Sequence, residues 1–195
     1  DFLNNTELTA EHKKIITLGL HHEQQHQELL FTDIKYILGH NPLFPPYQLQ
    51  TDDDEWKPSI RPGIKHQEQN IFIDIPEGLY EVGYKGRNFC FDNELSRHKV
   101  YLNDYSISSL LVTNEEYLEF IESGAYRDFK YWHAEGWDWV QNNQIQAPLY
   151  WHFIGEKWFN YTFNGLKPID LYEAVCHINF YEAAAFAAWK GMRLP

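Results

Sequence analysis

Residues 9–39 read TAEHKKIITLGLHHEQQHQELLFTDIKYILG, a proline-free stretch that ends at Gly39 with Pro42 close behind. A glycine followed by a proline is a typical stop signal, so this stretch predicts one long helix. At helical spacing, one stripe of the helix collects apolar residues together with two histidines and an aspartate. The stripe consists of Ile15, Leu18, His22, His26, Leu29, Asp33 and Ile37. A single helix cannot bury its own stripe, so we expect partner helices, which the chain hardly supplies before residue 9.

The two histidines of the stripe, His22 and His26, are four residues apart and share a helix face, about 6 Å apart along the axis. Burying an imidazole costs free energy unless its ring nitrogens find partners, and a metal ion is one such partner. Gln25 and Asp33 add polar groups that can support ligands. We therefore predict a metal site on this pair, with ordinary hydrogen-bonded histidines as the alternative. His21 lies about 100° from His22 on the helical wheel and is expected to be solvated.

Residues 22–26, HEQQH, also match the H-E-x-x-H motif, in which two histidines bind zinc and the glutamate is the general base of a hydrolase. Glu23 would be that base. The metzincin form of the motif requires a glycine and a further histidine where this chain has Leu29 and Thr32. The zinc-hydrolase interpretation stays open as an alternative.

Residues 41–70 contain five prolines and an acidic triplet without any period, which predicts an irregular linker. The stretches IFIDI and LYEVG flank Pro76-Glu77-Gly78 and predict a hairpin, and HKVYL and YSISS predict further strands joined at Asn103-Asp104.

Two capping-box patterns follow, Thr113 with Glu116 and Asn179 with Glu182, and each predicts a helix that runs to a glycine, at Gly124 and Gly191. Between the two helices, residues 125–170 are rich in Trp, Tyr, Gly and Asn with little periodicity, which predicts long loops held by aromatic side chains.

The composition restricts the classes of function. With 195 residues and 44% hydrophobic residues the chain is long enough to form a core. A formal net charge of −12 argues against nucleic acid and anionic membranes as partners, because both require clustered Lys and Arg. With neither an apolar segment long enough to cross a bilayer nor a signal-peptide core, a cytoplasmic location is expected. Cys90 and Cys176 are expected to be buried, reduced thiols.

Two parts of the chain resemble a known family. The stretch HHEQQHQELLFTDIKYILGHNP, residues 21–42, resembles the histidine-bearing helix of the DinB-like domain in ergothioneine-biosynthesis sulfoxide synthases. Residues 71–195 resemble the formylglycine-generating-enzyme-like domain of the same enzymes, a variant of the C-type-lectin fold. The matching stretches are IPEGLYEVG, FCFDNELSRHKV, VTNEEYLEFIESGAY, YWHAEGWDWV, PLYWH and HINFYEAAAFAAWKGMRLP.

The resemblance implies an α+β chain with three parts. A DinB-like helical segment would occupy residues 1–44, a linker residues 45–69, and the formylglycine-generating-enzyme-like domain residues 70–195. Both domains would be truncated, as the C-terminal part of a helical bundle and the N-terminal part of a lectin-like domain. The third iron ligand is then expected upstream of Asp1, and further substrate contacts beyond Pro195.

The resemblance also implies a chemistry. Family members hold a non-haem Fe(II) on three histidines, and O2 and a thiol (cysteine or γ-glutamylcysteine) react there with the imidazole of trimethylhistidine to give a sulfoxide with a new C–S bond. Carried over by position, His22 and His26 are metal ligands and Gln25 orients the bound imidazole. Glu23 is then a surface residue. An ovothiol-type enzyme that uses plain histidine, the zinc hydrolase, and a non-catalytic lectin-like module remain as alternatives. Oligomeric state is not indicated.

The remaining motif residues receive structural roles. The FDNE stretch, with Asp92, Asn93 and Glu94, is interpreted as tying strands and loops together. Four tryptophans are interpreted mainly as core or loop anchors, namely Trp132, Trp137, Trp139 and Trp151. The cysteines that act in true formylglycine-generating enzymes fall beyond Pro195 in this comparison, so Cys90 and Cys176 are not assigned their role.

Overall fold

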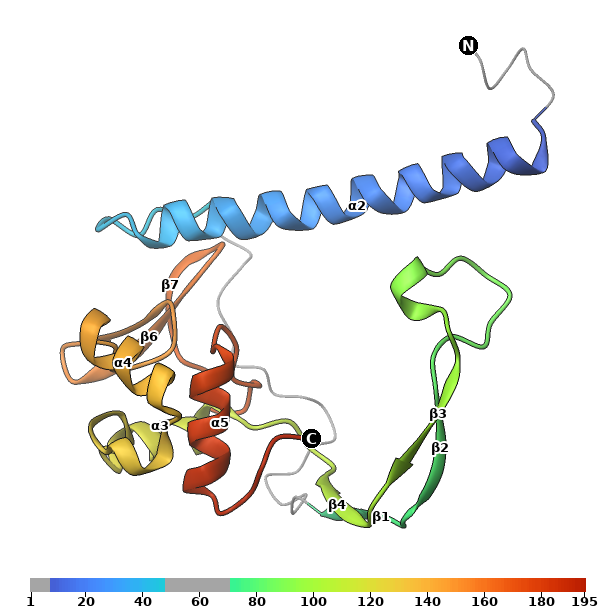
Figure 1. The fold of residues 1–195 in the computed structure, drawn as a ribbon. Helices are drawn as coiled ribbons and strands as arrows, with labels where there is room; N and C mark the ends of the chain where they lie inside the picture. The colour runs from blue at the N-terminus through green and yellow to red at the C-terminus, as the bar shows by residue number, and fades with distance from the viewer. Residues whose placement is uncertain (1–7, 48–70) are drawn as a thin grey trace. The chain divides into compact units, whose positions relative to one another are not determined.

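The computed structural model describes residues 8–47 and 71–195 (Figure 1). The described residues form two compact units, each built from two stretches of chain. The first takes its residues from Asp1–Ile37 and Asp74–Ser106, and the second from Leu38–Ile73 and Ile107–Pro195. The division into segments 1–44, 45–69 and 70–195 stays a prediction, and residues 48–69 of the predicted linker lie outside the described residues.

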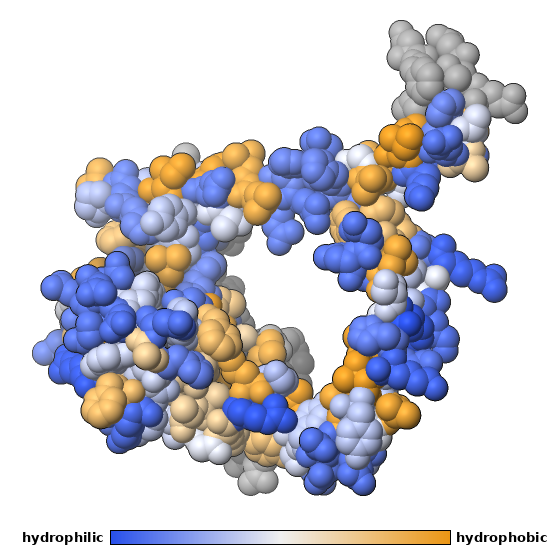
Figure 2. Space-filling view, viewed as in Figure 1, coloured by the Kyte–Doolittle hydropathy of each residue, from blue (hydrophilic) through white to orange (hydrophobic). Residues whose placement is uncertain are grey.

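The long N-terminal helix is confirmed as α2 (Ala10–Gly39). Thr9 begins it, since its side-chain oxygen accepts a hydrogen bond from the His12 amide at 3.2 Å. Along α2 the apolar stripe is exposed within the described part of the chain, with Ile15 61% and Ile37 67% exposed. Figure 2 shows hydrophobic residues among polar ones along the helix. None of the helices in residues 8–47 and 71–195 is both long and apolar enough to cross a bilayer.

The four strands after residue 70 form where they were predicted, but they pair differently. Strand β1 (Phe72–Ile75) pairs with β4 (Tyr105–Ser108), and β2 (Gly78–Val82) pairs antiparallel with β3 (His98–Leu102). The predicted hairpin of the first two strands is therefore wrong, and the two strands joined at residues 103–104 do not pair with each other. Strands β1 and β2 instead follow one another along one side of a long ribbon, and β3 and β4 return along the other side. Pro76 interrupts the first side between β1 and β2 and does not form a hairpin turn there.

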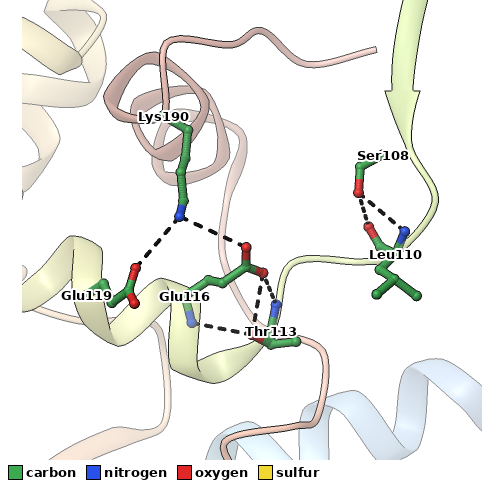
Figure 3. Close-up of polar contacts among 6 residues, drawn as sticks. All are labelled: Ser108, Leu110, Thr113, Glu116, Glu119 and Lys190. Atoms are coloured by element: carbon green, nitrogen blue, oxygen red, sulfur yellow. Dashed lines mark hydrogen bonds and ion pairs between the residues drawn. The ribbon is translucent and has the colours of Figure 1, made fainter. Parts of the chain in front are cut away.

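Both predicted capping boxes are confirmed, and each begins a helix of the second unit. Thr113 and Glu116 exchange hydrogen bonds at the start of α3 (Asn114–Glu122), as Figure 3 shows. Asn179 and Glu182 do the same at the start of α5 (Phe180–Trp189). The chain leaves both helices through glycines with positive φ, 81° at Gly124 and 71° at Gly191.

An ion pair joins these two helices. The Lys190 ammonium lies 3.7 Å from a Glu119 carboxylate oxygen and 4.0 Å from one of Glu116 (Figure 3). All three side chains are partly solvated, so the pair contributes little and the helices are held by packing. The packing is aromatic, because the Tyr117 ring of α3 stacks on the Phe186 ring of α5 with their centroids 5.3 Å apart.

The prediction of long loops over residues 125–170 is wrong. This region contains α4 (Ala134–Asn143) and a three-stranded antiparallel sheet of β5 (Trp151–Ile154), β6 (Lys157–Thr162) and β7 (Gly165–Pro168). Two short 3-10 helices precede α4, η2 (Ala125–Arg127) and η3 (Phe129–Tyr131). The predicted aromatic anchoring does occur.

Aromatic side chains from these elements form the core of the second unit. The buried cluster consists of Tyr117, Phe120, Ala125, Tyr126, Trp132, Val140, Trp151, Ala185 and Phe186. Trp137 and Trp139 pack against it and are partly buried. All four tryptophans of the sequence interpretation thus lie in the core or against it.

Gly39, the last residue of α2, belongs to the second unit and approaches two of its tyrosine rings closely. A Cβ atom at Gly39 would lie 2.8 Å from the Tyr150 ring and 2.9 Å from the Tyr161 ring. The Tyr161 hydroxyl also donates to the Pro45 carbonyl at 2.7 Å. The contact therefore has no room for a side chain at residue 39.

Two glycines of α2 provide a matched test of this contact. Gly39→Ala is expected to lower the free energy of unfolding by about 1–3 kcal/mol, because the new methyl group must displace two packed rings. Gly19→Ala meets nothing within 4 Å and should raise stability by up to about 1 kcal/mol, since alanine favours the helix. Urea unfolding of both variants measures the difference. Equal effects of the two substitutions would show that the contact at Gly39 is loose.

Candidate metal centre

The predicted ligands His22 and His26 lie side by side on α2. Their ring centroids are 4.5 Å apart and their planes cross at 77°. Both side chains are exposed within the described part of the chain, as is the rest of the stripe. The two imidazoles are thus neighbours on an open helix face, which a ligand can reach.

This separation agrees with two imidazoles bound to one cation. With a metal–nitrogen distance of about 2.1 Å, each ring centroid lies roughly 3.3 Å from the metal, so two ligands at a right angle have centroids about 4.6 Å apart. The observed 4.5 Å is close to that value. Neutral imidazole is also a donor that iron, zinc and copper all accept. The same separation and crossing angle also occur in an ordinary edge-on contact between two rings, so the assignment of the pair to a metal stays a prediction.

The described residues do not complete a metal site around His22 and His26. No group of three or more His, Cys, Asp or Glu side chains able to hold a metal occurs within residues 8–47 and 71–195. Gln25, Glu23 and Asp33 are all exposed on α2. The third ligand, expected upstream of Asp1, stays a prediction.

His21 is not solvated, contrary to the prediction. Its ring is half-buried and stacks on Phe89, with centroids 3.9 Å apart and planes 11° from parallel. Phe91 meets the same imidazole edge-on at 6.3 Å. Both phenylalanines come from the connection between β2 and β3, which sequence reasoning did not place beside the helix. The contact joins residues 68 positions apart, and no local signal predicts it.

The FDNE stretch forms a tight turn next to these rings. Asp92, Asn93 and Glu94 make the 3-10 helix η1 (Asp92–Glu94), and the Glu94 carboxylate accepts a hydrogen bond from the Phe91 amide at 2.8 Å. The Glu94 carbonyl accepts from the Tyr84 amide at 2.8 Å. These bonds stay within the loop, as the structural interpretation of FDNE expects.

The second unit contains a cleft of about 940 Å³. Aromatic side chains line much of it, and so do Glu182 and two histidines, His152 and His177. Four lining residues that are not glycines adopt the left-handed conformation, with φ 46° at Phe44, 53° at Gln144, 73° at Tyr150 and 62° at His177. Such conformations cost free energy and recur at functional sites. Sequence reasoning missed this cleft because nothing in the local sequence marks a tyrosine or histidine for positive φ.

His152 is the polar group of this cleft with the least compensation. Its Nε2 atom is buried and has no hydrogen-bond partner within the described residues. The Phe44 ring lies 4.6 Å away. Burial, with the nearby His40, lowers the pKa of His152, so the imidazole is neutral near pH 7.

A chain of hydrogen bonds lies at the base of α5. The Tyr126 hydroxyl donates to Glu182 at 2.7 Å and lies 3.1 Å from the Tyr117 hydroxyl. Glu182 is only 3% exposed, and burial raises the pKa of its carboxyl group. Burial also raises the pKa of both tyrosines, which therefore stay protonated as donors.

The raised pKa of Glu182 predicts a pH dependence of stability. Because the folded protein holds this proton more tightly than the unfolded chain, its stabilising effect is complete below the unfolded pKa and is lost as pH rises through the folded pKa. Each unit of difference between the two pKa values is worth about 1.4 kcal/mol. Glu182→Gln has no proton to lose. Urea unfolding from pH 4 to 8 should therefore show wild-type stability falling relative to the variant, and parallel curves would contradict the prediction.

Comparison with known proteins assigns the chain from residue 61 onward to a class. Residues 61–195 match the model of the sulfatase-modifying factor enzyme 1-like domain. The chain belongs to this family.

Particular relatives extend the similarity to the helix that carries the histidine pair. The chain is 31% identical over 180 residues to the hercynine oxygenase of Mycolicibacterium smegmatis, covering 91% of this chain and 39% of that protein. It is 29% identical over 179 residues to the hercynine oxygenase of Mycolicibacterium thermoresistibile, covering 89% and 36%. It is 36% identical over 104 residues to that of Mycobacterium tuberculosis, covering 53% and 24%. The chain thus spans well under half the length of these relatives.

Proposed function

We propose that this chain is part of an Fe(II)- and O2-dependent sulfoxide synthase. The enzyme would form a C–S bond between a cysteine-type thiol, cysteine or γ-glutamylcysteine, and the imidazole of trimethylhistidine (hercynine). The observation that carries the proposal is the pair His22 and His26, whose ring separation suits one metal, on a helix within the region similar to hercynine oxygenases.

In this proposal the side chains of α2 have distinct roles. His22 and His26 each present a ring nitrogen to the metal, and a third ligand comes from outside the described residues. Bound Fe(II) would supply open positions at which O2 and a thiolate can meet. Gln25, next to His26 and one turn from His22, is exposed and able to hydrogen-bond the substrate imidazole and fix its orientation. Glu23 takes no part in the reaction.

Oxygen consumption by the full-length, Fe(II)-loaded protein tests the proposal. We expect uptake that requires both trimethylhistidine and a thiol, with the sulfoxide product identified by mass spectrometry. Comparing cysteine with γ-glutamylcysteine identifies the thiol donor. Thiol-dependent uptake with plain histidine but not with trimethylhistidine would instead favour the ovothiol-type enzyme. No thiol-dependent uptake with either compound would refute both.

Glu23 separates the proposal from a zinc hydrolase. In a hydrolase the glutamate of H-E-x-x-H is the general base, so Glu23→Gln would abolish activity. In the sulfoxide synthase the same substitution alters an exposed residue without a proposed role, so turnover should stay within about twofold of wild type. Measuring kcat and KM for the variant distinguishes the two mechanisms.

A further inference from the structure

The half-buried imidazole of His21, beside the pair His22 and His26, indicates a role beyond the proposed activity. His21 precedes the ligand His22 in the chain, and its ring lies flat against Phe89. Phe91 supports both, edge-on to His21 and, with its centroid 4.9 Å away, edge-on to Phe89. Three rings from two distant segments therefore form one aromatic cluster within the first unit.

Helix geometry places this cluster next to the residue proposed to orient the substrate. With 3.6 residues per turn, Gln25 lies about 40° around the helix from His21, and His22 lies about 100° from it in the same direction. Around the circumference of the helix, Gln25 therefore lies between the aromatic cluster and the pair His22 and His26. A loop that rests on His21 borders the flank of α2 from which Gln25 projects.

The loop that carries the two phenylalanines is held by its own hydrogen bonds. Phe91 donates its amide to Glu94, and the Tyr84 hydroxyl donates to the Asn88 carbonyl at 3.0 Å. Arg97 bonds to the Gly83 carbonyl at 3.1 Å and pairs with Glu81 on β2. These contacts fix the base and the tip of the loop, so the two rings are presented as a preformed surface.

We propose that His21 is a positioning residue rather than a metal ligand, and that Phe89 and Phe91 act through it. The cluster fixes the flank of α2 that carries Gln25 and forms a wall beside the imidazole-bearing substrate. This inference rests on the proposed function. It identifies the β2–β3 loop as a determinant of substrate orientation, and it assigns His21 a role that depends on the flat shape of its ring and not on its nitrogens.

Substitutions at His21 separate the two roles. His21→Ala removes the stack and is expected to raise KM for trimethylhistidine about tenfold, with iron affinity within about twofold of wild type. His21→Phe keeps a flat ring and should restore KM. Phe89→Ala should behave like His21→Ala. Leu20→Ala, at the neighbouring exposed position, is the control and should change neither quantity.

A readout without metal or turnover tests the contact itself. In the metal-free protein, the imidazole protons of His21 should be shifted upfield by the Phe89 ring, and Phe89→Ala should remove the shift. Loss of iron in His21→Phe would show that His21 is a ligand and overturn the proposal. An unchanged KM in His21→Ala, or no upfield shift, would also overturn it. If the wild type shows no thiol-dependent oxygen uptake, the proposed function fails, while iron affinity and the proton shift still report on His21.

Discussion

His26→Ala in the full-length protein is expected to lower iron affinity at least about 100-fold and to abolish thiol-dependent oxygen uptake. Even a lost outer contact to a metal ligand typically costs 10–100-fold, and in the proposed site His26 is itself a ligand. The His22 and His26 rings lie 4.5 Å apart, and in the proposed site both bind the same metal. Removing one imidazole leaves the metal with a single ligand from this helix. Metal content after dialysis and oxygen uptake with trimethylhistidine and a thiol measure the two effects.

The control for this prediction is another histidine of the first unit. His98, on β3, hydrogen-bonds the Ser96 carbonyl at 2.9 Å and is exposed. His98→Ala should retain iron and turnover. If His26→Ala kept its iron while His98→Ala lost it, the metal would not lie on α2.

Phe120→Ala is expected to lower the free energy of unfolding by about 3–5 kcal/mol, the usual cost of deleting a fully buried phenylalanine. Its side chain is completely buried, and five aromatic rings surround it with centroids 5.3 to 6.4 Å away. These rings come from α3, α5 and the segment between α3 and α4, so the cavity would lie where all of them meet. Urea unfolding, followed by tryptophan fluorescence, measures the loss.

Phe129 provides the matched control for Phe120, nine residues away. It is 69% exposed, and Phe129→Ala should change stability by less than about 1 kcal/mol. Similar losses for both variants would mean that the aromatic core around α3 is not the main source of stability in this unit.

The parts of the fold that the sequence predicted are those with local signals. The capping pairs of Thr113 and Asn179 mark helix starts because donor and acceptor lie three residues apart in the chain. The strands of the first unit were recognised by their alternation. Their pairing was wrong, because pairing depends on contacts between residues far apart in the chain, 16 to 24 positions in the β2–β3 pair, and alternation carries no information about the partner.

The error over residues 125–170 has a different cause. The residue before helix α4, His133, makes no side-chain capping hydrogen bond. The helix therefore lacks the capping-box pattern by which the other two helices were predicted. Strands β5 and β6 are joined by Gly155 and Glu156, both with positive φ. Glutamate is not typical of such a turn, so the sequence did not indicate a hairpin here. The prediction of buried cysteines was also wrong: both thiols are free, but Cys176 is exposed and Cys90 half-buried.

The candidate site divides in the same way. His22 and His26 could be selected from sequence because their spacing is a property of one helix. The wall made by Phe89 and Phe91 could not, since it reaches His21 from another segment of the chain. The strained Tyr150 and His177 of the second cleft are equally invisible, because their conformations are imposed by the surrounding tertiary structure.

The two connections among strands β1 to β4 have equal lengths, and this limits where residues can be inserted or deleted. Two residues separate β1 from β2, and two separate β3 from β4. One residue added to a single side would turn every following side chain to the opposite face, because alternate residues of a strand point to opposite sides. The loop that carries Phe89 would then be inverted relative to α2. An insertion of one residue is therefore tolerable in the β1–β2 connection only together with an insertion of one residue in the β3–β4 connection.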